Sequence, residues 1–153
     1  MALYMGLDVG GTTVKGIICD ETGKEIVLDN IQVVSGEGLA GCIEALAEKL
    51  VRAAGTVFSK IDGIGVCCPG IIDAQNGVCV YSGNLQLKNY PLKSLLEEKL
   101  QRPVAICNDA NAAALGEAKF GAGKKYSDSI LVTLGTGVGG GIIIGGKLFE
   151  GNK

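Results

Sequence analysis

The sequence predicts an α/β fold in which helices pack against a mixed β-sheet. Three observations support this prediction. Short apolar segments at 3–9, 14–20 and 25–34 follow one another through tight turns, as in an antiparallel meander. Later segments alternate between helix-like and strand-like patterns, as in sheets with parallel pairs. Finally, glycine and threonine interrupt two strongly apolar runs, near residue 10 and near residue 136.

The first 55 residues supply the meander and one covering helix. The turn between the second and third strands is Glu21-Thr22-Gly23-Lys24. Between residues 39 and 54, apolar side chains recur every three or four positions, with charged residues on the opposite side. This periodicity predicts an amphipathic helix that ends near Gly55 and covers one face of the sheet.

The middle of the chain alternates strands and helices. Residues 61–68 are almost continuously apolar and stop at Pro69-Gly70, which predicts a buried parallel strand. Asn76-Gly77 separates two short apolar runs and predicts a two-residue hairpin turn. Pro91 then opens a helix that runs to about Gln101.

The last third contains a strand, a helix and a second hairpin. A short strand at 104–107 leads into a helix from Asp109 to about Phe120, and 121–125 is predicted to be a linker. We assign 1–122 to a first lobe, and 123–153 to the linker and first hairpin of a second lobe. Two strands alone are marginally stable in water, so we expect the chain to be cut from a larger protein.

Charge and hydropathy narrow the class of partner. The chain has 14 basic and 16 acidic residues, a net charge of −2, and no basic block. This balance argues against nucleic acid or an anionic membrane as a partner. No apolar stretch approaches the roughly 18 residues of a membrane span, and Asp8 interrupts the start of the chain. We therefore expect a cytoplasmic protein with a small ligand.

The titratable side chains limit the chemistry. Six cysteines occur without a Cys-x-x-Cys pair, so we expect buried thiols with no metal or redox role. Histidine is absent, which removes the commonest catalytic base and metal ligand. Acid–base chemistry must then use carboxylates, lysine or tyrosine.

The two glycine-threonine segments are candidate phosphate loops. Glycines allow the backbone to turn sharply and present N–H donors to an anion, and threonine adds a hydroxyl. We predict phosphate contacts from Gly10, Gly11, Thr12, Thr13 and Lys15 in the first segment, and from Thr136 and Gly137 in the second. The alternatives are ordinary hairpin turns and, for Lys15, a solvated surface side chain.

Two better-known phosphate motifs do not fit. Gly135, Gly137 and Gly140 match Gly-x-Gly-x-x-Gly, but a β-type apolar run follows where a dinucleotide fold needs a helix. Residues 141–147 match a P-loop, but Leu148 occupies the position of the Ser or Thr that would bind Mg²⁺.

Two carboxylates occupy positions where a phosphate-binding site would use them. Asp8 ends the first strand and could hold Mg²⁺ directly or through water; the alternative is a turn cap. Asp109 follows an apolar strand and begins a helix. In phosphoryl transfer a carboxylate takes the proton of the attacking hydroxyl, which is the role we predict for Asp109. The alternative is that Asn108 or Asp109 only caps the helix.

These motifs together resemble the ROK family of sugar kinases and sugar-responsive repressors. The resemblance extends from about residue 5 to residue 151. It is carried, in order, by Asp8-Val9-Gly10-Gly11-Thr12 with Lys15, by Pro69-Gly70 with Asp73 and Gly77, by Asn84-Leu85, by the segment Asn108 to Glu117, and by the segment Leu134 to Gly141.

The resemblance implies an actin-like (ribonuclease H-like) ATPase fold of two lobes, with sugar and ATP meeting in a cleft. By position, Asp109 matches the catalytic base of the family. Gly70, Asn84 and Asn108, with Asp109, match its sugar-binding residues. Gly11 to Thr13 match the first phosphate loop and Thr136-Gly137 the second, and Asp8 corresponds to the acidic residue near Mg²⁺.

The implied function is ATP-dependent phosphorylation of a hexose such as glucose, by a protein of which this chain is the N-terminal portion. The resemblance implies ATP and Mg²⁺ as cofactors. Zinc is expected only in the Gly-His segment and cysteine cluster that family members carry after about residue 151. We also expect a homo-oligomer, and we expect the chain alone to be inactive.

Two other functions remain alternatives. Repressors of the family carry a helix-turn-helix before the first phosphate loop, and only seven residues precede Asp8 here. A naturally short binding or assembly protein is the third possibility. The identity of the sugar is open among glucose, mannose, fructose, allose and N-acetylated hexosamines.

Overall fold

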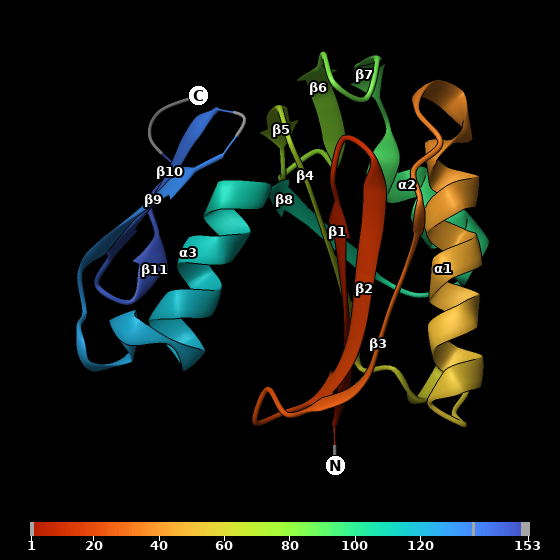
Figure 1. The fold of residues 1–153 in the computed structure, drawn as a ribbon, viewed down its shortest axis with the longest axis horizontal. Coiled ribbons are helices and arrows are strands. Elements are labelled where there is room, and N and C mark those ends of the chain that lie inside the picture. The colour runs from red at the N-terminus through yellow and green to blue at the C-terminus, as the bar shows by residue number, and fades with distance from the viewer. Residues whose placement is uncertain (1, 136, 151–153) are drawn as a thin grey trace. The chain divides into compact units, whose positions relative to one another are not determined.

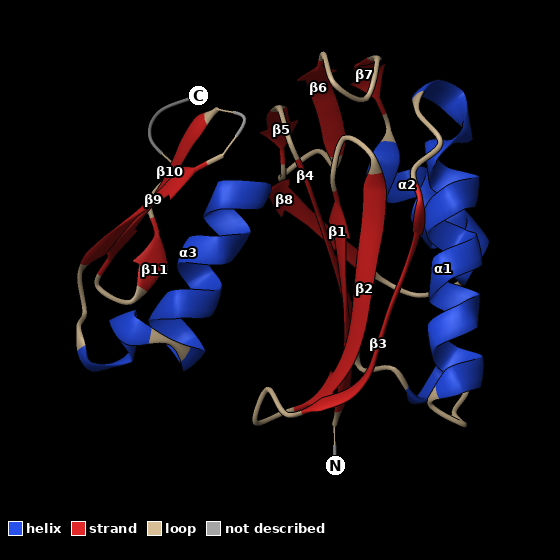
Figure 2. Cartoon of the chain, in the orientation of Figure 1, coloured by secondary structure: helices blue, strands red, loops and turns tan. Residues whose placement is uncertain are grey.

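The computed structural model describes residues 2–135 and 137–150. They group into two compact units, the first extending to Cys107 and the second beginning at Asn108. Figure 1 follows the chain from end to end, and Figure 2 distinguishes helices from strands.

The first unit is built on a five-stranded sheet with the order β3-β2-β1-β4-β8. The β1–β2 and β2–β3 pairs are antiparallel, whereas β1 and β4 are parallel. The predicted meander, the buried parallel strand and the mixed sheet are therefore confirmed. The strands are β1 (Leu3–Val9), β2 (Thr13–Asp20), β3 (Glu25–Gln32), β4 (Gly63–Cys68) and β8 (Val104–Asn108).

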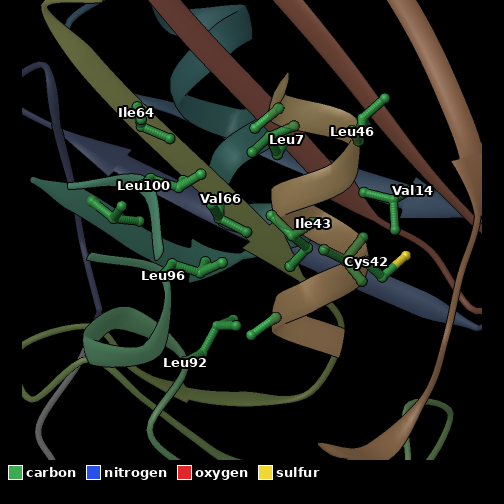
Figure 3. Packing of buried hydrophobic residues seen from close by; sticks show 14 of the residues in the cluster. Leu7, Val14, Cys42, Ile43, Leu46, Ile64, Val66, Leu92, Leu96 and Leu100 are labelled. Carbon is green, nitrogen blue, oxygen red and sulfur yellow. The ribbon is translucent and has the colours of Figure 1, made fainter. Parts of the chain in front are cut away.

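Two helices, α1 (Leu39–Ala53) and α2 (Leu92–Leu100), cover one face of this sheet (Figure 1). The short 3-10 helices η1 (Gly36–Gly38) and η2 (Phe58–Lys60) flank α1. The apolar stripe of α1 packs on β3, β2 and β1, where alternate strand residues point to the same face. Figure 3 shows this core, which includes Leu7, Val14, Ile43, Leu46, Ile64, Val66, Leu92 and Leu96, all buried.

The helix α1 lies very close to β2 at one glycine. A Cβ built on Gly16 would lie 2.5 Å from Leu50 Cδ1 and 2.8 Å from Leu7 Cδ2. A side chain does not fit there without movement of the core.

Three of the six cysteines, Cys42, Cys68 and Cys79, are buried, as expected; Cys19, Cys67 and Cys107 are only half-buried.

A second, three-stranded sheet in the first unit has the order β5-β6-β7. Its strands are β5 (Ile71–Asp73), β6 (Val78–Ser82) and β7 (Leu87–Tyr90). The predicted β5–β6 hairpin is confirmed, but its two-residue turn is wrong, and β7 was not predicted. A two-residue type I′ turn needs positive φ at both positions, whereas only Gly77 has it, at +74°. Asp73 stabilises a longer turn by accepting hydrogen bonds from Asn76 N (3.1 Å) and Asn76 Nδ2 (2.7 Å).

The second unit consists of one helix and a small antiparallel sheet. It contains α3 (Asp109–Phe120), η3 (Ala122–Lys125), β9 (Ser129–Leu134), β10 (Val138–Ile144) and β11 (Lys147–Leu148), with the strand order β11-β10-β9. The predicted linker at 121–125 instead folds largely into the 3-10 helix η3. The helix α3 groups with the strands that follow it, although the sequence pattern predicts it as part of the first lobe. The lobe boundary of a whole protein stays a prediction.

None of the helices in the described part of the chain combines the length and apolar character needed to cross a membrane.

Candidate functional site

The first glycine-threonine segment forms a compact turn between β1 and β2. Gly10 N donates to Thr13 O at 2.9 Å, which closes the turn, and Val33 N donates to Thr12 O at 3.0 Å, which ties it to the end of β3. Gly11 and Thr12 are exposed at its tip. The turn therefore exposes its backbone to solvent while hydrogen bonds hold it in place, as a phosphate loop requires.

A row of polar side chains crosses the sheet beside this turn. Asp8 on β1 is paired with Lys15 on β2 and with Cys67 on β4. All three point away from the helices, because their neighbours Leu7, Val9 and Val66 are buried in the core. Cys67 Sγ donates a hydrogen bond to Asp8 Oδ1 at 3.3 Å. No ion pair found among the described residues joins Asp8 to Lys15.

Asp8 is the predicted Mg²⁺ ligand. Its carboxylate is exposed at the end of a strand, beside the glycine turn. Mg²⁺ prefers carboxylate oxygen, keeps several waters and uses few protein ligands. Across residues 2–135 and 137–150, no group of three or more His, Cys, Asp or Glu could hold a metal ion. A single exposed carboxylate is compatible with such an ion, and Mg²⁺ binding at Asp8 stays a prediction.

Asn84 and Gly70 lie in loops of the first unit. A Cβ built on Gly11 would lie 4.0 Å from Asn84 Cβ, so Asn84 stands next to the first glycine turn. Gly70 has φ +120°, and a Cβ there would lie 2.2 Å from Tyr81 O. Only glycine fits this position, so the structure gives Gly70 a backbone role in the turn from β4 to β5.

Asn108 and Asp109 begin the helix α3. Asn108 Oδ1 accepts hydrogen bonds from Ala110 N (2.9 Å) and Asn111 N (3.3 Å), which makes it the N-cap. The capping interpretation is thus confirmed for Asn108. Asp109 is exposed, and its Oδ1 accepts from Ala110 N at 3.0 Å. A carboxylate has about four lone-pair sites, so this bond is compatible with further contacts.

The second glycine segment joins β9 to β10. Gly135 N donates to Gly137 O at 2.9 Å across the turn. Thr136, predicted to contact phosphate, lies outside the described residues. Two later glycines face α3 instead of solvent: a Cβ would lie 3.1 Å from Ala110 Cβ at Gly139, and 2.5 Å from Ala114 Cβ at Gly141. The glycine run therefore has a packing role in addition to the predicted phosphate role.

The predicted residues fall into two sets, one in each unit. The first unit brings together Asp8, Lys15, Gly11 and Asn84, with Gly10, Thr12 and Thr13 completing the turn. The second unit holds Asn108, Asp109 and Gly137. Sequence reasoning missed the contact of Cys67 with Asp8. Asp8 and Cys67 are neighbours only through the register between β1 and β4, and no local sequence motif predicts that register.

Comparison with known proteins gives strong matches over almost the whole chain. The chain is 38% identical over 152 residues to the glucokinase of Streptomyces coelicolor, covering 99% of the chain and 47% of that protein. It is 39% identical over 150 residues to the xylose repressor of Caldicellulosiruptor bescii, covering 96% of the chain and 38% of the repressor. A crystal structure of a ROK family glucokinase from Streptomyces griseus, in complex with glucose and AMPPNP, superposes with a TM-score of 0.90 at 36% identity, covering 99% of the chain and 47% of that structure.

These matches confirm the predicted fold, since the structural neighbours are ROK kinases with the actin-like ATPase architecture. The chain spans about half the length of the glucokinases that it matches. A model of the ROK family matches residues 4–153, and this chain therefore belongs to the ROK family.

Proposed function

We propose that this chain supplies the sugar-side part of an ATP-dependent hexose kinase, with Asp109 as the catalytic base. The observation that carries the proposal is that an exposed carboxylate begins a helix whose first turn packs beside the end of a glycine-rich hairpin, within one compact unit. A base and a phosphate loop in one unit suit phosphoryl transfer. The likeness to glucokinases at 38% identity supports the same reaction.

In the proposed mechanism Asp109 accepts the proton of the sugar hydroxyl that attacks the γ-phosphorus of ATP. The bond from that hydroxyl oxygen to phosphorus forms as the bond from phosphorus to the β,γ-bridging oxygen breaks. The proton goes to the Asp109 carboxylate, and ADP leaves with the electron pair. The chain has no histidine for this step, so a carboxylate in the first turn of α3 is a suitable acceptor.

The first glycine turn, with Asp8, Lys15 and Asn84 beside it, would bind the phosphates, the metal ion and the sugar during this transfer. Backbone N–H groups at Gly11 and Thr12 would bind phosphate oxygens, and Lys15, on the strand that follows, would add a positive charge. Asp8 would hold Mg²⁺ through water, and the bound ion would supply neutralisation of the developing phosphate charge. Asn84, placed beside Gly11, would orient a sugar hydroxyl close to the phosphates.

A sugar-responsive repressor is the second candidate. The match to the xylose repressor of Caldicellulosiruptor bescii, at 39% identity, is as strong as the match to the glucokinase. A repressor needs sugar binding without a catalytic base, whereas Asp109 is exposed and begins α3. This difference favours the kinase. Cytoplasmic location, where ATP and sugar phosphates occur, belongs to the same proposal.

A coupled assay distinguishes the kinase from the repressor. It uses the full-length protein, meaning this chain with whatever precedes and follows it. The protein is tested with ATP, Mg²⁺ and a panel of glucose, mannose, fructose, allose and N-acetylated hexosamines. We expect ADP formation that depends on at least one sugar. Sugar binding by calorimetry with no ADP formation for any sugar, together with binding to operator-like DNA, would establish the repressor and refute the kinase.

A further inference from the structure

Near the hairpin turn, the residues of β10 that face α3 are glycines. Gly139 and Gly141 of β10 lie against Ala110 and Ala114 of α3, and we call these four residues the glycine–alanine seam. At Gly141 a Cβ would lie 2.5 Å from Ala114 Cβ and 2.9 Å from Ala110 O. At Gly139 it would lie 2.6 Å from Thr133 Oγ1 and 3.1 Å from Ala110 Cβ. The seam is too close for any side chain at Gly141 unless the helix moves.

The spacing of the two partners makes this contact regular. Two strand residues advance about 6.6 Å, since each rises about 3.3 Å. Four helix residues advance about 6 Å, since each rises about 1.5 Å. The spacing of Gly139 and Gly141 along β10 therefore matches the spacing of Ala110 and Ala114 along α3. The helix runs alongside β10 in the direction away from the hairpin turn. The next inward residue of β10 is the buried Ile143, so the small residues are confined to the turn end.

The seam lies immediately beside both predicted catalytic elements. Gly139 pairs with Thr133, and only the pair Val138–Leu134 separates it from the turn at 135–137. Ala110 directly follows Asp109, and the helix direction places Asp109 on the turn side of Ala110. A Cβ built on Gly139 would lie 3.1 Å from the Ala110 methyl group, and one built on Gly141 would lie 2.5 Å from that of Ala114, so helix and strand approach closely here. The closeness of helix and strand thus fixes where Asp109 stands relative to the second phosphate loop.

We infer that Gly139 and Gly141 are positioning residues for the kinase reaction: by lacking side chains they seat α3 on β10 and hold the Asp109 base at a fixed place beside the Gly135–Gly137 turn. This inference rests on the proposed function. A displacement of about 1 Å at a catalytic group can cost about 100-fold in rate. One added methyl group at the seam, 2.5 Å from Ala114 Cβ, demands a shift of that size.

The test compares matched glycine substitutions in the full-length protein. In Gly141→Ala the added methyl group clashes with α3. In Gly139→Ala the clash is smaller, because Thr133 Oγ1 can rotate away. Gly140→Ala is the control: it makes the same change one residue away on the opposite face, where the nearest atom is Leu131 O at 3.3 Å. The double variant Gly141→Ala/Ala114→Gly removes the closest clash. Calorimetric titration with sugar counts intact sites, so that kcat is expressed per folded molecule.

We expect kcat per intact site to fall by about tenfold or more in Gly141→Ala and by less in Gly139→Ala, with Gly140→Ala within about twofold of wild type. The double variant should regain several-fold of the lost kcat, which a general loss of stability would not explain. An unchanged kcat in both seam variants, or an equal loss in Gly140→Ala, would overturn the inference while the kinase assignment stands. A wild-type protein that transfers no phosphoryl group to any sugar would overturn the proposed function, and the inference with it.

Discussion

At the scale of single residues, Asp109 carries the chemical proposal. Its carboxylate is exposed, and one oxygen accepts a hydrogen bond from Ala110 N. The substitution Asp109→Asn keeps the size of the side chain and removes its basicity. We expect kcat of the full-length protein to fall by at least about 1,000-fold, while sugar affinity stays within about tenfold. Rate measurements with calorimetric sugar titration test this, and full activity of the variant would remove the base assignment.

Gly16 provides a residue-scale test of the core. A methyl group there would meet Leu50, Leu7 and Leu46 at 2.5, 2.8 and 3.1 Å. We expect Gly16→Ala to lower the free energy of unfolding by about 1–3 kcal/mol, the usual cost of overpacking. Urea denaturation measures the change. Gly65→Ala on β4 is the matched control, because no atom lies within 4 Å of its added Cβ. Equal effects of the two substitutions would contradict the packing described here.

At the scale of elements, the second hairpin has one covered and one exposed face. The face toward α3 carries the glycines of the seam. The other face exposes Val132 (60%), Leu134 (81%) and Val138 (79%), with Ile130, Ile142 and Ile144 also exposed. Strand β9 is moreover an edge of its sheet. An apolar face next to a free strand edge favours association.

We therefore expect residues 1–153, prepared alone, to self-associate through this hairpin. Val132→Lys should shift the sedimentation profile toward the monomer. Leu28→Lys on β3 likewise replaces an aliphatic side chain that is 60% exposed with lysine, and it should leave the association unchanged. A strictly monomeric wild-type profile at high concentration would count against the expectation.

Elements also show what the sequence could and could not predict. The helices α1 and α3 and the first three strands follow from periodicity and from capping residues, which are local signals. The β5–β6 turn was predicted too short, because Asp73 stabilises a longer turn through its side chain. In the site, the glycine turns and the start of α3 were predictable. The Cys67–Asp8 contact and the seam depend on strand register and helix placement, which no local pattern encodes.

At the scale of the whole molecule, the chain spans 47% of the length of the glucokinase that it matches. The family resemblance places further sugar contacts and the adenine pocket beyond the residues present here. We therefore expect residues 1–153 alone to bind sugar weakly and to lack kinase activity. A coupled assay that compares them with the full-length protein at equal concentration checks this. ATP-dependent sugar phosphorylation by residues 1–153 would refute it.

The most direct test of the central claim is to follow the labelled γ-phosphoryl group of ATP in the full-length protein with Mg²⁺ and the sugar panel. We predict that the label appears in a hexose phosphate, one per ADP formed, and that Asp109→Asn abolishes this transfer. Release of the label only as inorganic phosphate, or no release with any sugar, would contradict the account.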